Sequence, residues 1–274
     1  MSRIENALEK AAQMLARSQF DPQSATPARS PDERTEQPIV PKNSNIVTLT
    51  EPDSPAAEEY RKLKTTVLKL APRHAKQYAL MVTSSLSGEG KSLTAINLAI
   101  SLAQDVGHSV LLIDADLRRP SLSEYMGVPD RTGLYECLFE GYPVSSAMIR
   151  TGISRLDLLP AGKAIRNPVE ILSSPMMRSL LGELKQLAPE RAIIIDTPPV
   201  LPFAETQAIS TMVDGILFVI GEGKTTVREL QDALEIIDGA KVLGVVFNGV
   251  TDGGMNNRYY HYYRYYAEKR HQQV

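Results

Sequence analysis

Cysteine is almost absent from this chain of 274 residues, which has only one, Cys137. A single thiol can form neither an intramolecular disulfide nor a cysteine-based zinc site, so the composition suits a reducing compartment. Cys137 lies in the segment GLYECLFEG, on an apolar helical pattern. That pattern indicates a small buried side chain rather than a reactive thiol.

Long apolar runs and an excess of basic residues are also missing. No 18 consecutive residues are apolar, so no transmembrane helix is predicted. The start, MSRIENALEK, places Glu5 and Glu9 where a signal peptide would be apolar. A net charge of −2 does not suit a general nucleic-acid-binding protein. We therefore expect no nucleic-acid partner and a cytoplasmic location, peripheral at the inner membrane only through a partner.

Changes in composition divide the chain into four parts. Residues 1–20 contain an amphipathic pattern at 3–18, which predicts a helix that either caps its own domain or docks on a partner. Residues 21–55 are rich in proline and polar side chains, which predicts a linker. Residues 56–250 form the main domain, and residues 251–274 form a mobile tail rich in tyrosine.

The main domain alternates apolar strand-like runs with helical patterns. The strands are expected at 78–84, 109–116, 155–161, 191–199, 215–220 and 241–249, and the main helices at 92–107, 175–188 and 225–240. This alternation predicts an α/β fold with a mostly parallel sheet and helices on both faces. Such sheets bind ligands at the carboxyl ends of their strands.

The tetrapeptide GEGK occurs twice, as GEGKS at 88–92 and GEGKT at 221–225. A phosphate-binding loop needs a strand, several loop residues with inward N–H groups, and then Gly-Lys-Ser/Thr at the start of a helix. The first copy satisfies this order, although Ser85 stands where the strict motif has glycine. The second copy leaves no room for a loop after its strand, so it is predicted to be a strand-to-helix turn. The expected nucleotide-binding residues are Ser87, Gly88, Glu89, Gly90, Lys91, Ser92 and Leu93.

Two further strands end in carboxylates. VLLIDAD places Asp114 and Asp116 at the end of one strand, and AIIID places Asp196 at the end of another. A Mg·ATP site needs one acid for the metal and one to receive a proton from the attacking hydroxyl. A strand-end aspartate often only caps the next turn. Three of them after a phosphate loop favour a P-loop nucleotide-hydrolase fold that uses ATP and Mg²⁺.

Several linked segments resemble the bacterial tyrosine kinases of capsule and exopolysaccharide biosynthesis. TSSLSGEGKSLTAINLA resembles the Walker A motif of that family, VLLIDADLRRP its Walker A′ motif and IIIDTPP its Walker B motif. GLYECLFEG and LLPAGKAIRNPVEILSS resemble its connecting segments. The resemblance covers about residues 56–266, and it extends to the autokinases of exopolysaccharide loci linked to exosortase-type sorting.

The resemblance implies a role for each matching residue. Lys91 and Ser92 would hold the phosphates and the metal, and Asp116 and Asp196 would help to hold Mg²⁺. Asp114 would be the better candidate for the base that activates a tyrosine hydroxyl, although the sequence leaves the choice between Asp114 and Asp116 open. Arg118 and Arg119 either neutralise the transferring phosphoryl group or pair with surface acids.

The chain departs from the family pattern at two places. The family's E-x-x-R-x-x-R helix, which packs one subunit on the next, appears here as Glu58, Arg61 and Lys64. Lysine lacks the bidentate fork of arginine, so weaker ring assembly is expected. The last strand ends in Asn248 followed by glycine rather than lysine. Contact with the adenine through Asn248 is therefore expected without the lysine contribution.

The tail holds six tyrosines within eight residues, whereas the whole chain has 11. They are Tyr259, Tyr260, Tyr262, Tyr263, Tyr265 and Tyr266. A tail of eight to fifteen extended residues reaches about 25–50 Å, and a tether of this kind gives millimolar effective concentration. Tyrosine also suits an interface, but this cluster contains no Leu, Ile or Phe, so the tail is predicted to be the substrate.

Two other functions fit parts of the pattern. A partition or septum-site ATPase shares the fold, but it has an early loop lysine where this chain has Leu86. An iron–sulfur reductase of similar fold needs two cysteines per subunit. A nucleotide-dependent switch for a membrane partner remains open. The expected partners are further copies of the chain, in an oligomer or ring, and a membrane-integral polysaccharide co-polymerase that activates the kinase.

Overall fold

A computed structural model of the protein describes residues 41–70, 77–105, 107, 109–129, 131–187, 190–237 and 242–250. The predicted N-terminal helix, the linker as far as residue 40 and the tyrosine tail lie outside these residues. Three of the four predicted parts of the chain therefore stay predictions in whole or in large part.

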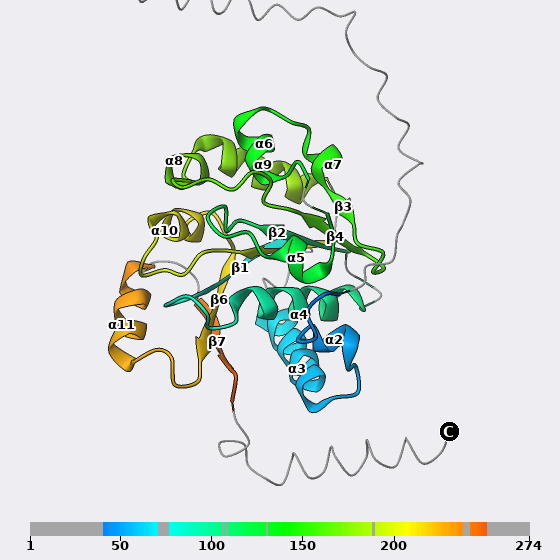
Figure 1. The fold of residues 1–274 in the computed structure, drawn as a ribbon, viewed down its shortest axis with the longest axis vertical. Helices are drawn as coiled ribbons and strands as arrows, with labels where there is room; N and C mark the ends of the chain where they lie inside the picture. Colours follow the sequence, from blue (N-terminus) through cyan, green and yellow to red (C-terminus); the bar gives the residue numbers. More distant parts are fainter. Residues whose placement is uncertain are drawn as a thin grey trace, which may run out of the picture. The chain divides into compact units, whose positions relative to one another are not determined.

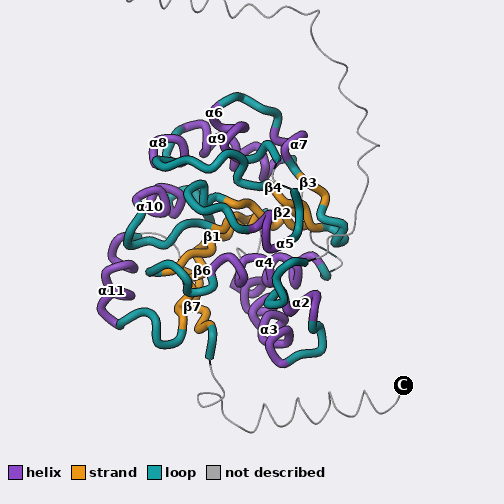
Figure 2. The backbone as a smooth tube through the Cα atoms, in the orientation of Figure 1, coloured by secondary structure: helices purple, strands orange, loops and turns teal. Residues whose placement is uncertain are grey.

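The strands within these ranges form one seven-stranded sheet, in the order β3-β4-β2-β5-β1-β6-β7 (Figures 1 and 2). Their bounds are β1 Tyr78–Ser84, β2 Ser109–Asp114, β3 Ile149–Arg150, β4 Leu156–Leu159, β5 Arg191–Asp196, β6 Gly215–Gly221 and β7 Val242–Asn248. All neighbouring pairs are parallel except β3 with β4. The predicted, mostly parallel α/β sheet is confirmed.

Helices cover both faces of the sheet (Figure 1). Alternate residues of a strand face opposite sides, so Met81 and Ile113 belong to one apolar cluster whereas Val82 and Leu112 belong to the other. The second cluster is covered by α2 Val47–Thr50, α3 Pro55–Leu70, α4 Lys91–Ala103 and α5 Leu122–Met126. The first is covered by α6 Leu134–Phe139, α7 Val144–Ala147, α8 Val169–Leu172, α9 Pro175–Gln186, α10 Ala204–Ser210 and α11 Val227–Ile236.

The six predicted strands and three predicted helices are all present, with ends shifted by a few residues. Strand β3 was not predicted, because two residues are too short to show an alternating pattern. Cys137 lies on α6, only 6% exposed, and burial raises the pKa of its thiol to about 11. No helix among the described residues has the length and apolarity needed to cross a membrane.

The segment before residue 56 is folded, unlike the predicted linker. Ile46 is fully buried, and α2 packs on the main domain. The Asn97 side chain on α4 accepts hydrogen bonds from the Thr48 N–H (3.0 Å) and the Thr48 hydroxyl (2.9 Å), and it donates to the Asn45 carbonyl (3.0 Å). The folded domain therefore begins earlier than the predicted boundary.

Replacing Ile46 by alanine tests whether this segment is part of the fold. Deleting a fully buried isoleucine side chain costs about 2–5 kcal/mol, so we expect the free energy of unfolding of Ile46→Ala to fall by that amount in urea titrations. Val227→Ala is the control, because that side chain is 73% exposed. Equal stability of Ile46→Ala and the parent would place the segment outside the cooperative unit.

Candidate functional site

The loop between β1 and α4 comprises residues 85–90. Gly88 and Gly90 have φ angles of 82° and 93°, which disfavour any residue with a side chain. A Cβ atom at Gly90 would also lie 1.9 Å from Nδ2 of Asn248. The second GEGK copy forms the turn from β6 into α11, as predicted, so the first copy is the one that has phosphate-loop geometry.

A cavity of about 540 Å³ opens beside this loop at the carboxyl edge of the sheet. Six of the predicted nucleotide-binding residues line it, namely Ser87, Gly88, Gly90, Lys91, Ser92 and Leu93. Glu89 and Asn248 do not line the cavity. Asn248 lies behind the loop, where its amide donates to the Glu89 carbonyl (2.9 Å).

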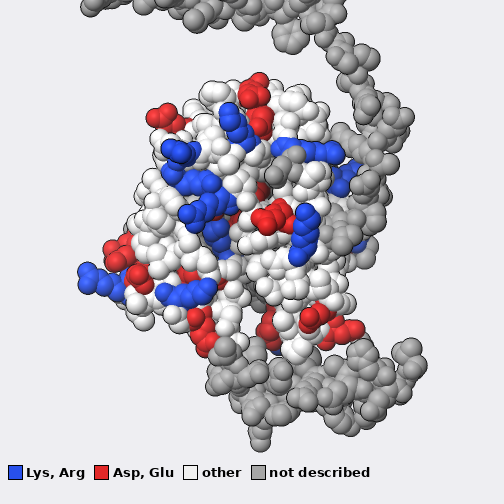
Figure 3. Space-filling view, viewed as in Figure 1, with Lys and Arg blue, Asp and Glu red and all other residues white. Residues whose placement is uncertain are grey.

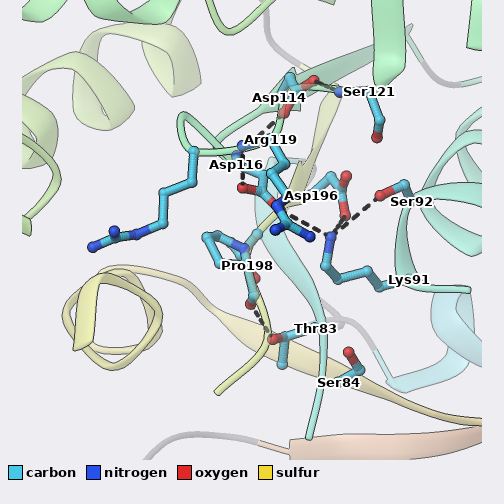
Figure 4. A network of polar contacts seen from close by, with 12 residues as sticks. Thr83, Ser84, Lys91, Ser92, Asp114, Asp116, Arg119, Ser121, Asp196 and Pro198 are labelled. Atoms are coloured by element: carbon cyan, nitrogen blue, oxygen red, sulfur yellow. Dashed lines mark hydrogen bonds and ion pairs between the residues drawn. The ribbon is translucent and has the colours of Figure 1, made fainter. Parts of the chain in front are cut away.

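Lys91, Ser92, Asp116 and Asp196 converge at the base of the cavity (Figure 4). Nζ of Lys91 lies 3.1 Å from Oδ2 of Asp116, 3.4 Å from Oγ of Ser92 and 4.0 Å from Oδ1 of Asp196. Burial alone lowers the pKa of Lys91, but the nearby charges of Asp196 and Asp116 reverse this, and the net shift is upward. Lys91 therefore stays protonated at neutral pH.

Asp114 and Asp196 are held side by side beneath the cavity. They are register partners on β2 and β5, and neither is exposed. Oδ2 of Asp114 accepts hydrogen bonds from the N–H groups of Ser121 and Leu122, both at 3.0 Å, and Oδ1 accepts one from Asp116 at 3.1 Å. Burial raises the pKa of Asp114 to about 7, and the charge of Asp196 adds to the rise. Of the three predicted aspartates, Asp116 is the one that lines the cavity.

The donor set at Asp196 fits a magnesium ion that is brought by a nucleotide. Both carboxylate oxygens of Asp196 are buried and lack a hydrogen-bond partner among the described residues. The same part of the chain contains no group of three or more His, Cys, Asp or Glu side chains that could hold a metal alone. Magnesium is usually bound by one or two carboxylates, with phosphate and water as the remaining ligands. The residues present fit that arrangement.

Sequence reasoning missed Phe203, which lines one wall of the cavity, and Glu205, the partner of Arg118. Nε of Arg118 donates to the fully buried Glu205, and its guanidinium lies 4.6 Å from the Phe203 ring centre. Arg118 also donates to the carbonyl of Arg166. The sequence offers one signal for Phe203, which is its position shortly after IIIDTPP. No local pattern distinguishes Glu205 from other acidic residues. Arg118 therefore pairs with a buried acid rather than with the surface acids that were one expectation.

Basic side chains gather on the face that Figure 3 shows, over the region between α8, α10 and α5. Arg118 and Arg119, which line the cavity, come from the β2–α5 loop in this region. The Arg119 N–H donates to Asp116 (3.0 Å), whereas its guanidinium has no ion-pair partner among the described residues. This part of the cavity suits an anion.

The three residues predicted to make oligomer contacts lie on α3, away from the cavity. Glu58 and Arg61 form an ion pair with each other (2.5 Å), and Lys64 lies 3.9 Å from Asp105. Their role between subunits stays a prediction. The six tail tyrosines lie outside the described residues.

The buried carboxylate of Asp196 predicts an unusual pH dependence of stability. Burial raises its pKa to about 6, which Lys91 opposes only in part. An unfolded aspartate titrates near 3.9, so the folded state binds the proton more tightly and loses stability as the pH rises from about 4 to 6. We expect nucleotide-free Asp196→Asn to gain up to about 3 kcal/mol relative to the parent between pH 4 and 7.5.

Urea titrations across this pH range measure that difference. Asp232→Asn, an exposed change on α11, is the control and should follow the parent at every pH. If the difference in free energy of unfolding between Asp196→Asn and the parent stayed constant with pH, the prediction would be contradicted.

Known proteins resemble this chain in sequence and in structure. A family model described as an AAA domain matches residues 79–243. Tyrosine-protein kinase YwqD of Bacillus subtilis is 37% identical over 207 residues, which cover 75% of this chain and 86% of that protein. The wzc tyrosine-protein kinase of Salmonella typhi is 32% identical over 82% of this chain but only 31% of its own length.

Solved structures agree with these matches. The kinase domain of the Escherichia coli tyrosine kinase ETK superposes with a TM-score of 0.72 and 26% identity, over 83% of this chain and 87% of that one. The chimerical protein CapA2B2 gives a TM-score of 0.68 and 31% identity, over 77% and 93%. The phosphate loop, the strand-end aspartates and these similarities together show that the chain belongs to the bacterial tyrosine-kinase family and is a protein-tyrosine kinase.

Proposed function

We propose that this kinase uses Mg·ATP to phosphorylate the tyrosines of its own C-terminal tail, in trans within an oligomer. The observation that carries the proposal is the convergence of Lys91, Ser92, Asp116 and Asp196 on one cavity beside a phosphate loop. The backbone N–H groups of the loop and the positive end of the α4 dipole favour binding of an anion. The proposed phosphate site is therefore residues 85–92, with Lys91 at the β- and γ-phosphates.

We assign the metal to Ser92, Asp116 and Asp196. Bound Mg·ATP supplies the phosphoryl group, with the cation neutralising phosphate charge. Asp196 has free acceptor oxygens, and Ser92 and Asp116 line the cavity beside it. The Arg119 guanidinium is placed to meet the remaining negative charge at the cavity.

The proton of the acceptor phenol goes to Asp116 in this proposal, and not to Asp114 as the family resemblance implied. Asp114 is fully buried, and its oxygens accept three backbone hydrogen bonds. Asp114 also does not line the cavity in which the acceptor would lie. Asp116 lines the cavity, and its backbone N–H donates to Oδ1 of Asp114. Asp114 is thus a positioning residue for Asp116.

The opposite wall of the cavity suits a phenol ring. Pro199, Pro202 and Phe203 provide apolar surface there, and Arg118 fixes Phe203 from the side. An aromatic acceptor packs on such a surface while its hydroxyl points to the polar base. Serine or threonine would leave this wall uncovered.

The tail begins close to the site. Strand β7 ends at Asn248, whose amide bonds to the phosphate loop, and the tyrosine cluster follows 11 residues later, at Tyr259. We propose that the tail enters the cavity of a neighbouring subunit, through an oligomer whose contacts include Glu58, Arg61 and Lys64. We further propose that a membrane-integral co-polymerase activates the kinase. Residues 3–18 would dock on this partner at the cytoplasmic side of the inner membrane. The kinase would thereby regulate exopolysaccharide polymerisation and export.

Mass spectrometry of the purified chain after incubation with Mg·ATP tests the autokinase proposal. We expect phosphate on residues 259–266 of the parent and at least a 100-fold loss of labelling in Lys91→Met, since removing a charge from a preorganised site costs about 3 kcal/mol of transition-state stabilisation. Lys185→Met is the matched control, because Lys185 pairs with Asp214 near the start of β1, at the other end of the sheet. An unlabelled tail on a parent that binds ATP, even with activator segments added, would support a nucleotide switch instead.

Phosphorylation should also change the size of the assembly. Six phosphates add roughly −9 to −12 charges to each tail, and Arg258, Arg264, Lys269 and Arg270 offset only part of this. Crowded tails of this charge repel one another and the acidic base of the site. We expect light scattering to show smaller particles after full phosphorylation, and an unchanged oligomer size would refute the idea.

A further inference from the structure

The second GEGKT segment, residues 221–225, lies directly against the phosphate loop. Gly221 N–H donates to Oε1 of Glu89 (3.0 Å), and the Thr225 hydroxyl donates to the same oxygen (2.5 Å). Nζ of Lys224 donates to the Gly88 carbonyl. The turn that holds no phosphate therefore contacts the loop that does.

Glu89 links this turn to the loop from the inside. Its side chain is almost fully buried, at 1% exposure, and its other oxygen accepts the Leu86 N–H (2.7 Å). One carboxylate thus accepts three donors, two of them from residues more than 130 positions away. Loss of these bonds would leave buried donors unpaired, which is costly.

The two segments pack without spare room. A Cβ atom at Gly221 would lie 3.3 Å from Cα of Glu89 and 2.9 Å from Cδ of Lys224. A side chain at this position would displace Lys224 and push the two backbones apart by a few tenths of an ångström. The contact is therefore built into the backbone of the turn, and it does not depend on a flexible surface side chain alone.

Two donors set the orientation of consecutive peptide groups in the loop. Lys224 holds the Gly88 carbonyl, and the Asn248 amide holds the Glu89 carbonyl, both from outside the cavity. In a trans peptide the N–H points opposite to the C=O. Holding these carbonyls outward directs the N–H groups of Glu89 and Gly90 toward the cavity, and successive inward N–H groups form an anion-binding concavity.

We propose that Lys224, Thr225 and Asn248 are positioning residues that preorganise the phosphate loop for nucleotide phosphates. Lys224 and Asn248 act on the loop carbonyls, and Thr225 acts on the Glu89 carboxylate. The proposal rests on the proposed function only in that the loop binds nucleotide phosphate. Asn248 thereby has a role at the loop, and its expected contact with the adenine stays a prediction.

The affinity of the full chain for Mg·ADP, measured by titration calorimetry, tests this proposal without requiring phosphoryl transfer. We expect Lys224→Met and Thr225→Val each to weaken ADP binding roughly tenfold, the equivalent of one net hydrogen bond to a charged group. Lys224→Arg and Thr225→Ser keep the donors and should restore most of the affinity. Adenosine, which has no phosphate, should bind parent and variants alike.

Arg228→Met is the matched control, because it removes an exposed positive charge from the same helix start without touching the loop. ADP affinity that is unchanged in Lys224→Met and Thr225→Val would overturn the proposal. An equal loss in Arg228→Met would overturn it too, because the effect would then be one of overall charge. A parent that bound ADP but left its tail unlabelled with Mg·ATP, even with activator segments added, would overturn the autokinase proposal and leave this one standing.

Discussion

A single ammonium group, that of Lys91, faces the carboxylates of Asp114, Asp116 and Asp196 in a buried setting. The parallel sheet imposes this arrangement, because β2 and β5 end at the same level and place Asp114 opposite Asp196. Burial is the main cause that raises the pKa of Asp114 and of Asp196, and the neighbouring carboxylates add to the rise. Both oxygens of Asp196 also lack a hydrogen-bond partner among the described residues. The described residues therefore place three carboxylates against one ammonium group, an arrangement that would favour a cation carried by nucleotide phosphates, as proposed above.

The parts of the site differ in how firmly they are held. The Asp114 carboxylate and the Arg118 guanidinium are fixed by several hydrogen bonds, and the phosphate loop is fixed from behind by Glu89. Arg119 keeps an unpaired guanidinium within the described part of the molecule. Fixed groups reduce the reorganisation needed at the transition state. The Arg119 guanidinium lines the cavity without such a bond, so its charge stays available to an anion there.

The sequence was sufficient to predict the strands, the phosphate loop and the three strand-end aspartates. Their signals are local, since a buried parallel strand is a run of apolar residues and a phosphate loop has a fixed spacing. The features that the sequence did not predict depend on contacts with residues far away in the chain. Ile46 and Thr48 lie in a segment of linker-like composition. Ile46 is buried in an apolar cluster of the main domain, and Thr48 donates two hydrogen bonds to Asn97 of α4. Likewise, Glu205 looks like an ordinary helix-start acid until β2 brings Arg118 beside it.

Occupancy of the cavity beside Asp196 would also affect how long the protein survives in the cell. A ligand that binds only the folded chain stabilises it by about 2.7 kcal/mol when present at a hundred times its dissociation constant. Because proteases degrade transiently unfolded chains, such a shift changes steady-state abundance several-fold. Nucleotide bound to the folded chain would therefore slow its degradation, a difference that pulse proteolysis with and without nucleotide would register.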